Sequence, residues 1–266
     1  MRPVTLITGA SAGIGTALAR VFAQHGHELV LIARREQRLA ELADAIAAQG
    51  HKRPIFVPVD LTQPDAVDRI GDVLTMFDAE PDIIVNNAGF GLVGAAAEID
   101  HAEQLAMVDL NVRALTDLSL AFIEPLQRRK GGILNVASVA GFLPGPGMAV
   151  YYATKAYVLS FSEALHRELA PRGVRVTALC PGPVPSEFQA RAGVRAEHYP
   201  PIITQSAERV AEEGYRGLAA GRRLVVPGIG NKLVTFLVRL APRPLLLAAM
   251  DTRNRRRRVS SNVHKP

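Results

Sequence analysis

The chain has only one cysteine, Cys180, among its 266 residues. A single thiol excludes a framework of internal disulfide bonds, and sparse cysteine suits the reducing cytosol. Cys180 closes the apolar run 174–180, so we expect a small buried hydrophobic side chain there. We therefore predict a cytoplasmic protein.

We also expect no metal site, no leader peptide and no membrane-spanning segment. The seven histidines show no metal-ligand spacing and have no cysteine partners, so no metal site is predicted. Arg2 and Pro3 lead directly into an apolar run, which is not the pattern of a signal peptide. The apolar stretch 232–250 contains two arginines and two prolines, which argues against a transmembrane helix of about 20 apolar residues.

What the sequence does contain is a regular alternation of strand and helix patterns. Apolar, β-branched runs predict seven strands, at 3–8, 28–33, 54–59, 82–86, 132–138, 174–180 and 223–227. Apolar residues at helical spacing predict helices at about 14–25, 36–49, 64–77, 101–128, 150–170 and 206–220. This alternation predicts an α/β fold, a doubly wound parallel seven-stranded sheet with helices on both faces.

The chain is expected to form a single domain. With 48% hydrophobic residues it has ample material for one core, and no repeat of a solenoid period is present. We assign 1–228 to that domain and 229–266 to a basic C-terminal extension. Two pairs resemble helix-start capping patterns: Thr62 with Asp65, and Asp100 with Glu103.

A glycine-rich turn follows the first predicted strand. The segment 9–15 has the spacing G-x-x-x-G-x-G and leads into a predicted helix. Glycines permit a tight turn and a close approach of the backbone to a ligand. A strand, glycine turn and helix in this order direct free backbone N–H groups at a phosphate, so nucleotide binding is predicted.

Three polar residues point to chemistry on an oxygen atom. Tyr151 and Lys155 lie four residues apart in the predicted helix 150–170, so they share one helix face. Ser138 ends the predicted strand 132–138. A hydroxyl, a phenol and an ammonium group together supply what the interconversion of a carbonyl and an alcohol requires.

These motifs occur in an order that resembles the short-chain dehydrogenase/reductase family. They are T-G-A-S-A-G-I-G at 8–15, N-N-A-G at 86–89, Asn111, Ser138, Y-x-x-x-K at 151–155 and P-G at 181–182. The resemblance covers roughly residues 3 to 228, and these motifs in this order are far more specific than any one of them. It implies a Rossmann fold and an NAD(P)-dependent oxidoreductase.

The resemblance also implies a role for each catalytic residue. Tyr151 would be the general acid in reduction and the base in oxidation, with Lys155 lowering its pKa and holding the nicotinamide ribose. Ser138 would donate to the substrate oxygen. Asn111 would hold a water that relays protons to the lysine.

By the same resemblance, a dinucleotide would lie across the strand ends. The family often has threonine at position 186, and Ser186 keeps that hydroxyl, although Pro185 before it is a less usual choice. The expected cofactor contacts are Gly9, Ser11, Ala12, Gly13, Ile14, Gly15, Arg34, Arg35, Asp60, Leu61, Asn87, Ala88, Gly89, Tyr151, Lys155, Pro181, Gly182, Val184 and Ser186.

The end of the second predicted strand favours NADP(H) over NAD(H). NAD-specific dinucleotide folds place an acid there to hold the adenosine ribose. This chain instead has Arg34 and Arg35, whose guanidinium groups suit a 2′-phosphate. Glu36 is better explained as an acid in the first turn of a helix.

The expected substrate pocket is partly apolar. Phe142 and Phe188 would contact the substrate beside Ser138 and Tyr151, and residues 187–205 would form a lid. Leu143 and Met148 are expected to face the same pocket. This favours an apolar carbonyl or alcohol over a phosphorylated sugar, although the same residues are compatible with simple lid packing.

The C-terminal extension carries the chain's positive charge. Residues 229–266 contain nine Lys or Arg and one acid, a net of +8, whereas the whole chain has +6. Three hypotheses remain open: a helix packed over the pocket or a subunit neighbour, peripheral contact with an anionic membrane, or nucleic-acid binding. Nucleic acid is the least favoured of these partners.

The sequence therefore predicts an NADP(H)-dependent carbonyl reductase or alcohol dehydrogenase with a small-molecule substrate. We expect a homodimer or homotetramer assembled through the helices around 101–128 and 150–170, as the family resemblance implies. The alternatives are an NAD-dependent alcohol dehydrogenase of the same family and a non-catalytic nucleotide-binding regulator with a membrane-surface tail. Substrate identity and physiological direction are not encoded in these motifs.

Overall fold

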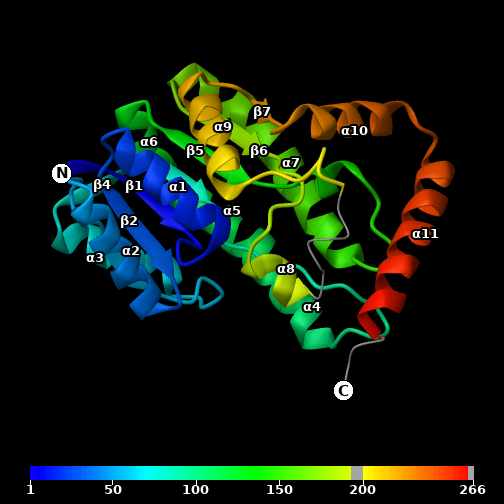
Figure 1. Ribbon diagram of the computed structural model, residues 1–266. Coiled ribbons are helices and arrows are strands. Elements are labelled where there is room, and N and C mark those ends of the chain that lie inside the picture. Colours follow the sequence, from blue (N-terminus) through cyan, green and yellow to red (C-terminus); the bar gives the residue numbers. More distant parts are fainter. Residues whose placement is uncertain (193–199, 263–266) are drawn as a thin grey trace.

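A parallel seven-stranded sheet forms the centre of the computed structural model, which describes residues 1–192 and 200–262 (Figure 1). The strand order is β3-β2-β1-β4-β5-β6-β7. This confirms the predicted α/β, doubly wound sheet, and each predicted strand is present. The strands are β1 (Arg2–Thr8), β2 (Leu29–Ala33), β3 (Ile55–Pro58), β4 (Ala79–Asn86), β5 (Gly132–Val136), β6 (Arg175–Leu179) and β7 (Leu224–Val225).

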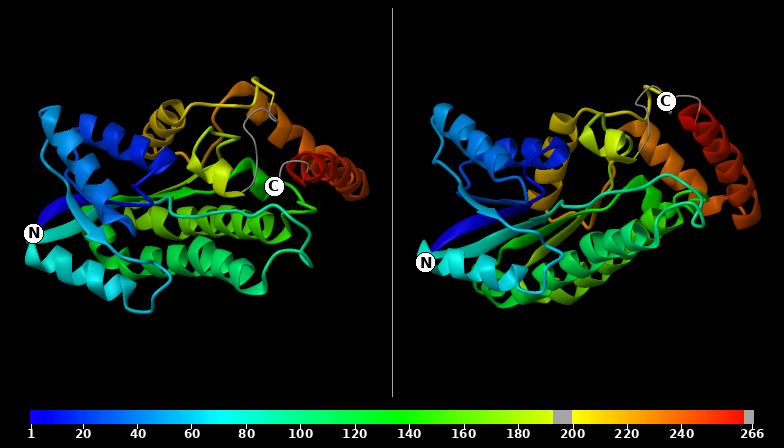
Figure 2. Two further views of the ribbon diagram at one scale, coloured as in Figure 1. Left: turned by 60° about the horizontal axis from the view of Figure 1, so that its bottom comes forward. Right: turned by 90° about the horizontal axis from the view of Figure 1, so that it is seen from below.

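Helices cover both faces of the sheet, as Figure 2 shows. Helices α1 (Gly13–Gln24), α2 (Glu36–Ala48) and α9 (Ala207–Ala219) pack on one face, where Leu18, Leu39 and Val210 belong to one buried cluster. Helices α3 (Ala66–Met76), α5 (Leu115–Ala121), α6 (Ile123–Arg129) and α7 (Ala149–Leu169) pack on the other, around Ile70, Leu118 and Leu165. Near-continuous apolar strands are thus explained by burial on both faces.

The remaining helical elements follow the ends of the strands or extend the chain. They are α4 (His101–Val108), a π-helical turn η1 (Asp109–Ala114), two short 3₁₀ turns η2 (Val139–Phe142) and η3 (Ala170–Arg172), α8 (Glu187–Ala192), α10 (Ile229–Leu240) and α11 (Arg243–Asn262). No helix among the described residues is long and apolar enough to cross a membrane.

The predicted helix 101–128 is wrong as a single element. It divides into α4, η1, α5 and α6. The second break falls at Phe122, because Pro125 lacks an N–H group and fits only the first turn of a new helix. The first break is the π-helical turn η1, which accompanies a long-range hydrogen bond from the Phe90 N–H to Asn111.

Of the two predicted capping patterns, one is confirmed and one is wrong. The Asp100 side chain accepts a hydrogen bond from the Glu103 N–H at 3.0 Å at the start of α4. Thr62 instead donates its N–H and its hydroxyl to Asp60, at 3.0 and 2.8 Å, and α3 begins after Asp65. Thr62 therefore stabilises the loop after β3 rather than a helix.

A buried chain of amide and hydroxyl groups connects the sheet to the helices below it. Asn86 Nδ2 donates to Ser119 Oγ at 2.8 Å and to Asn135 Oδ1 at 2.9 Å. Asn135 Nδ2 donates in turn to Ser162 Oγ at 2.9 Å. All four side chains are buried, so β4, β5, α5 and α7 are held in one register by satisfied polar contacts.

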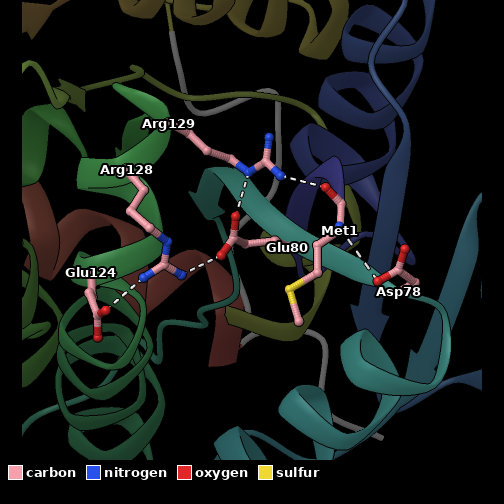
Figure 3. A network of polar contacts seen from close by, with 6 residues as sticks. All are labelled: Met1, Asp78, Glu80, Glu124, Arg128 and Arg129. Atoms are coloured by element: carbon pink, nitrogen blue, oxygen red, sulfur yellow. Dashed lines mark hydrogen bonds and ion pairs between the residues drawn. The ribbon is translucent and has the colours of Figure 1, made fainter.

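Ion pairs gather at the opposite, amino edge of the sheet (Figure 3). Glu80, at the start of β4, binds both Arg128 and Arg129 of α6. The hydrogen bond from Arg128 is the main reason that the pKa of Glu80 is lowered. Arg129 also donates to the Met1 carbonyl at 2.6 Å. These contacts hold α6 against the edge of the sheet where the parallel strands begin.

Replacing Asn135 with alanine should lower the free energy of unfolding by about 2–4 kcal/mol. The change leaves a cavity and removes the partners of two buried polar groups. Urea denaturation checks this, with the exposed Gln49→Ala variant as the control expected to change stability by less than about 0.5 kcal/mol. Equal midpoints for the two variants would show that the buried chain does not stabilise the fold.

Candidate functional site

A cavity of about 640 Å³ opens at the carboxyl ends of the strands. It lies where the strand order reverses, since β1 is followed in sequence by β2 on one side but pairs with β4 on the other. Open parallel sheets place their ligands at such a reversal, because the two adjacent loops diverge there. The cavity volume falls in the range of small-molecule and cofactor sites.

The glycine turn forms one wall of this cavity. Gly9 and Gly13 have φ of +64° and +55°, a conformation that favours glycine. A Cβ on Gly15 would lie 2.2 Å from the Gly9 carbonyl oxygen, so the third glycine permits close packing of α1 on the turn. Asn87 fixes the turn from β4 by donating to the Thr8 carbonyl at 2.9 Å.

Ser138, Tyr151 and Lys155 all line the cavity. Strand β5 ends at Val136, so Ser138 lies just beyond it, where its Oγ accepts from the Ala140 N–H at 3.1 Å and caps η2. Tyr151 is buried in the first turn of α7, and its ring packs 5.6 Å from that of Phe188. Gly91 makes room for both rings, because a Cβ there would lie within 3.0 Å of each.

Lys155 is a buried cation on the same face of α7. Its side chain is only 5% exposed, and Nζ donates to the Val136 carbonyl at 2.8 Å. Burial lowers its pKa from 10.5 to about 8, opposed by a weaker interaction with Cys180. Burial likewise raises the pKa of the Cys180 thiol to about 12. At neutral pH the site therefore contains an ammonium group beside a neutral thiol.

Asn111 lies behind the cavity wall rather than in it. Its Oδ1 accepts from the Phe90 N–H at 3.0 Å, and its Nδ2 donates to the Phe90 carbonyl at 2.9 Å and to Thr154 Oγ1 at 3.1 Å. The side chain sits in the π-helical turn η1, which turns it toward the loop after β4. The helix is interrupted there because this long-range contact outweighs regular helical geometry.

Arg34 and Arg35 line the far end of the cavity. Arg34 lies 3.7 Å from Asp60, and Arg35 donates to Ser11 Oγ at 3.3 Å and pairs with Glu187 of α8 at 2.8 Å. Partial burial alone would raise the pKa of Asp60, but hydrogen bonds from Thr62 and the charge of Arg34 lower it. Two arginines, each paired with a carboxylate, and a serine hydroxyl therefore lie together at this end of the cavity.

The other end of the cavity is apolar. Phe90, Leu143, Met148, Phe188 and Val234 line it, together with the ring of Tyr152. Phe142 was expected here and is not among the lining residues. Its ring instead packs below Arg239 of α10, with the guanidinium 5.5 Å from the ring centre.

The structure brings together most of the residues predicted from the sequence. All of the expected catalytic, cofactor and substrate residues line the cavity except Gly15, Asn111 and Phe142. Of the predicted lid, α8 and residues 200–205 are described, while residues 193–199, including Val194, His198 and Tyr199, lie outside the described residues.

Sequence reasoning missed Asn231 and Val234, and it included Glu187 in the predicted lid without its ion pair. Glu187 forms an ion pair with Arg35, which lies 152 positions earlier in the chain, and no local sequence pattern predicts such a contact. Asn231 and Val234 come from α10, in the segment treated as a separate extension. The hypothesis of a helix packed over the pocket is the one that these two residues support.

The residues present fit a nicotinamide dinucleotide. The glycine turn leaves space for a ligand that a side chain would occupy. A Cβ atom on Gly13 would lie 3.2 Å from the Cβ of Ser186. The arginines supply charge at one end, and Ser138, Tyr151 and Lys155 supply polar hydrogens at the other. No group of three or more potential metal ligands occurs among the described residues.

Comparison with known proteins agrees with this arrangement. A family model described as short chain dehydrogenase matches residues 3–196. Sulfoacetaldehyde reductase 2 of Chromohalobacter salexigens is 38% identical over 191 residues, which are 71% of this chain and 75% of that protein.

Two solved structures are similar over most of the chain. A short-chain dehydrogenase from Sphingobium yanoikuyae in complex with NADPH has a TM-score of 0.78 and 34% identity, and the match covers 85% of this chain and 88% of the other. A bulky-bulky ketone specific alcohol dehydrogenase from Comamonas testosteroni has a TM-score of 0.73 and 31% identity over 85% and 86%.

The buried Lys155 should make stability depend on pH. Its pKa is about 8 in the folded chain against 10.5 for an ordinary lysine, so the unfolded chain binds more protons between these values and stability rises with pH there. Relative to a Lys155→Met variant, the natural protein should gain about 2 kcal/mol of unfolding free energy between about pH 7.5 and pH 10.

Urea denaturation of both proteins at the two pH values measures this gain. Cys180 and the other groups that titrate in this range are common to both proteins, so their contributions largely cancel in the difference. A difference that does not change with pH would show that Lys155 keeps its ordinary pKa.

Proposed function

The chain belongs to the short-chain dehydrogenase family of oxidoreductases, and we propose that it interconverts a carbonyl and an alcohol on an apolar substrate with NADP(H) as cofactor. The observation that carries the proposal is that Ser138, Tyr151 and Lys155 line the same cavity. These three come from a loop and a helix of separate sequence regions, so their meeting is a property of the fold.

The nicotinamide ring, when bound, supplies or accepts the hydride. Tyr151 then gives a proton to the carbonyl oxygen in reduction and takes it back in oxidation. An ordinary tyrosine has a pKa of about 10, so the reaction at neutral pH needs a nearby positive charge. Lys155 supplies that charge, and its burial makes the interaction stronger than it would be in water.

Ser138 stabilises the negative charge that develops on the substrate oxygen. Its Oγ accepts from the Ala140 N–H, and its contact to the Pro181 carbonyl is long, at 3.5 Å. A hydroxyl held in this way has its hydrogen available for a substrate. Asn111 has a positioning role, since it fixes the loop of Phe90 against α7 through Thr154; a proton relay through it remains a prediction.

The arginines support NADP(H). Arg34 and Arg35 lie at the end of β2, and guanidinium groups form strong paired hydrogen bonds to phosphate. The NADPH bound to the Sphingobium protein agrees with this choice. NAD(H) is the second candidate, because Asp60 and Glu187 already neutralise part of this charge.

The apolar end of the cavity supports an apolar substrate. Its lining of Phe90, Leu143, Met148, Phe188 and Val234 offers area to hydrocarbon groups on both sides of a carbonyl. The name of the Comamonas protein, which refers to bulky-bulky ketones, is consistent with a substrate of this kind.

Exposed hydrophobic residues support assembly into a homodimer or homotetramer. Leu105, Val108, Leu120 and Tyr157 are each 38% exposed or more on α4, α5 and α7. These are the helices expected to form subunit contacts. A cytoplasmic location remains a prediction from the cysteine content.

Tyr151→Phe should lower kcat by roughly 10³-fold while NADPH still binds, because the change removes only the proton that the mechanism transfers. NADPH absorbance with a panel of ketones measures turnover, and fluorescence titration measures binding. Tyr152→Phe is the matched control in the same cavity and should keep kcat within about threefold. Substantial activity in Tyr151→Phe would refute the acid–base assignment.

Arg34→Ala combined with Arg35→Ala should raise the Kd for NADPH about 100-fold and change that for NADH by less than about threefold, because two charge-assisted contacts to the 2′-phosphate are lost. Glu187→Gln is the control, since it breaks the same ion pair but keeps Arg35. That variant should bind NADPH at least as tightly as the natural protein. Equal losses for both cofactors would rule out the 2′-phosphate role.

A further inference from the structure

Five large apolar side chains of α10 are exposed on one face of the helix. They are Ile229, Leu233, Phe236, Leu237 and Leu240, from 53% to 83% exposed. Their spacings of four, three, one and three residues place them on one side of a helix with 3.6 residues per turn. We call these five residues the α10 stripe.

Helix α10 differs from an ordinary surface helix in that it exposes its apolar side chains and buries others. Its buried residues are Gly230, Asn231 and Thr235, which are small or polar. Asn231 Nδ2 donates to the Pro227 carbonyl at 2.9 Å and to that of Ile203 at 3.1 Å, and these bonds fix which face points inward. A helix in water usually buries its apolar side, so the exposed stripe marks a surface for contact with another apolar phase or molecule.

Positive charge borders the stripe. Lys232 and Arg239 both lie on one flank of the stripe, about 40° and 60° from its edge at 100° per residue, and both are exposed. Arg243 is exposed at the start of α11. Residues 229–266 as a whole have a net charge of +8, while the rest of the chain has −2.

The stripe lies at the margin of the molecule and beside the cavity. Figure 1 shows α10 and α11 projecting along one end, beyond the sheet. Val234 and Asn231 of the same helix line the cavity. A surface that covers the stripe would therefore lie next to the apolar end of the site.

We propose that the α10 stripe inserts into the interfacial region of an anionic lipid bilayer, with Lys232 and Arg243 facing lipid phosphates. An apolar face bordered by Lys and Arg is the pattern of a helix that lies in the plane of a membrane surface. Anionic lipids attract such basic segments electrostatically. As a consequence that rests on the proposed function, an apolar substrate would reach the cavity from the lipid phase.

A second copy of the chain fits the stripe less well. A two-fold contact through α10 would bring two segments of net charge +8 to the same interface, where they repel. The apolar residues of α4, α5 and α7 also give subunit assembly a separate surface. Charge complementarity thus favours the bilayer.

The test is sedimentation of the full chain with lipid vesicles. Vesicles of equal parts phosphatidylglycerol and phosphatidylcholine should bind the natural protein, whereas phosphatidylcholine alone or high salt should bind much less. Leu233→Gln, Leu237→Gln and Leu240→Gln together should lower the partition coefficient at least about tenfold, because three side chains lose their apolar burial. The matched control is Met76→Gln, which changes an exposed apolar residue on α3.

Two further measurements keep the result interpretable. Fluorescence titration with NADPH should give the same Kd for the triple variant and the natural protein, which separates this proposal from the cofactor assignment. Sedimentation equilibrium without vesicles should give the same mass for both. The proposal is overturned if the natural protein ignores anionic vesicles, if the triple variant binds them equally well, or if the variant loses a subunit.

Discussion

The site depends on keeping a lysine ammonium group buried at the carboxyl end of β5. Lys155 is held by the Val136 carbonyl at 2.8 Å and is almost inaccessible to water. Burial of a charge is costly, and the lowered pKa of about 8 records that cost. Glycines on two sides permit the arrangement: a Cβ on Gly141 would lie 2.7 Å from the Lys155 carbonyl oxygen, and one on Gly89 would lie 2.8 Å from Asn111 Oδ1. The position of α7 against its neighbouring loops is therefore nearly fixed.

The buried amide and hydroxyl chain explains how the fold maintains that position. Ser162 of α7 accepts a hydrogen bond from Asn135, which is next to Val136, whose carbonyl accepts the hydrogen bond from Lys155. Helix α7 is thus attached to β5 by hydrogen bonds at two points, about two helical turns apart. Satisfied buried polar contacts specify a unique packing more strictly than apolar contacts do. The same chain reaches Asn86, directly before the loop that borders the cofactor end of the cavity.

Local patterns were sufficient for the strands, and tertiary contacts explain what they missed. Apolar runs and the glycine turn predicted β1 to β6 within three residues at each end, because burial on both faces leaves little freedom. The helix 101–128 failed because Asn111 is bound by the distant Phe90. Phe142 was misplaced because its partner, Arg239, belongs to a helix whose path depends on β7. The Arg35–Glu187 pair joins the start of α2 to the start of α8, which meet only in the folded protein.

One face of helix α10 packs on the catalytic domain and the other faces outward. The proposed division between the domain 1–228 and the extension 229–266 is therefore less sharp than the charge composition implies. The Asn231 amide connects the turn at Ile203, within the predicted lid, to Pro227 after β7. Gly182 leaves space for that amide, since a Cβ there would lie 2.5 Å from it. A displacement of α10 must therefore be transmitted to the loop after β6 and to the cavity wall. Because interiors are close-packed, such a displacement cannot be absorbed locally, so whatever covers the outer face of α10 also influences the shape of the apolar end of the site.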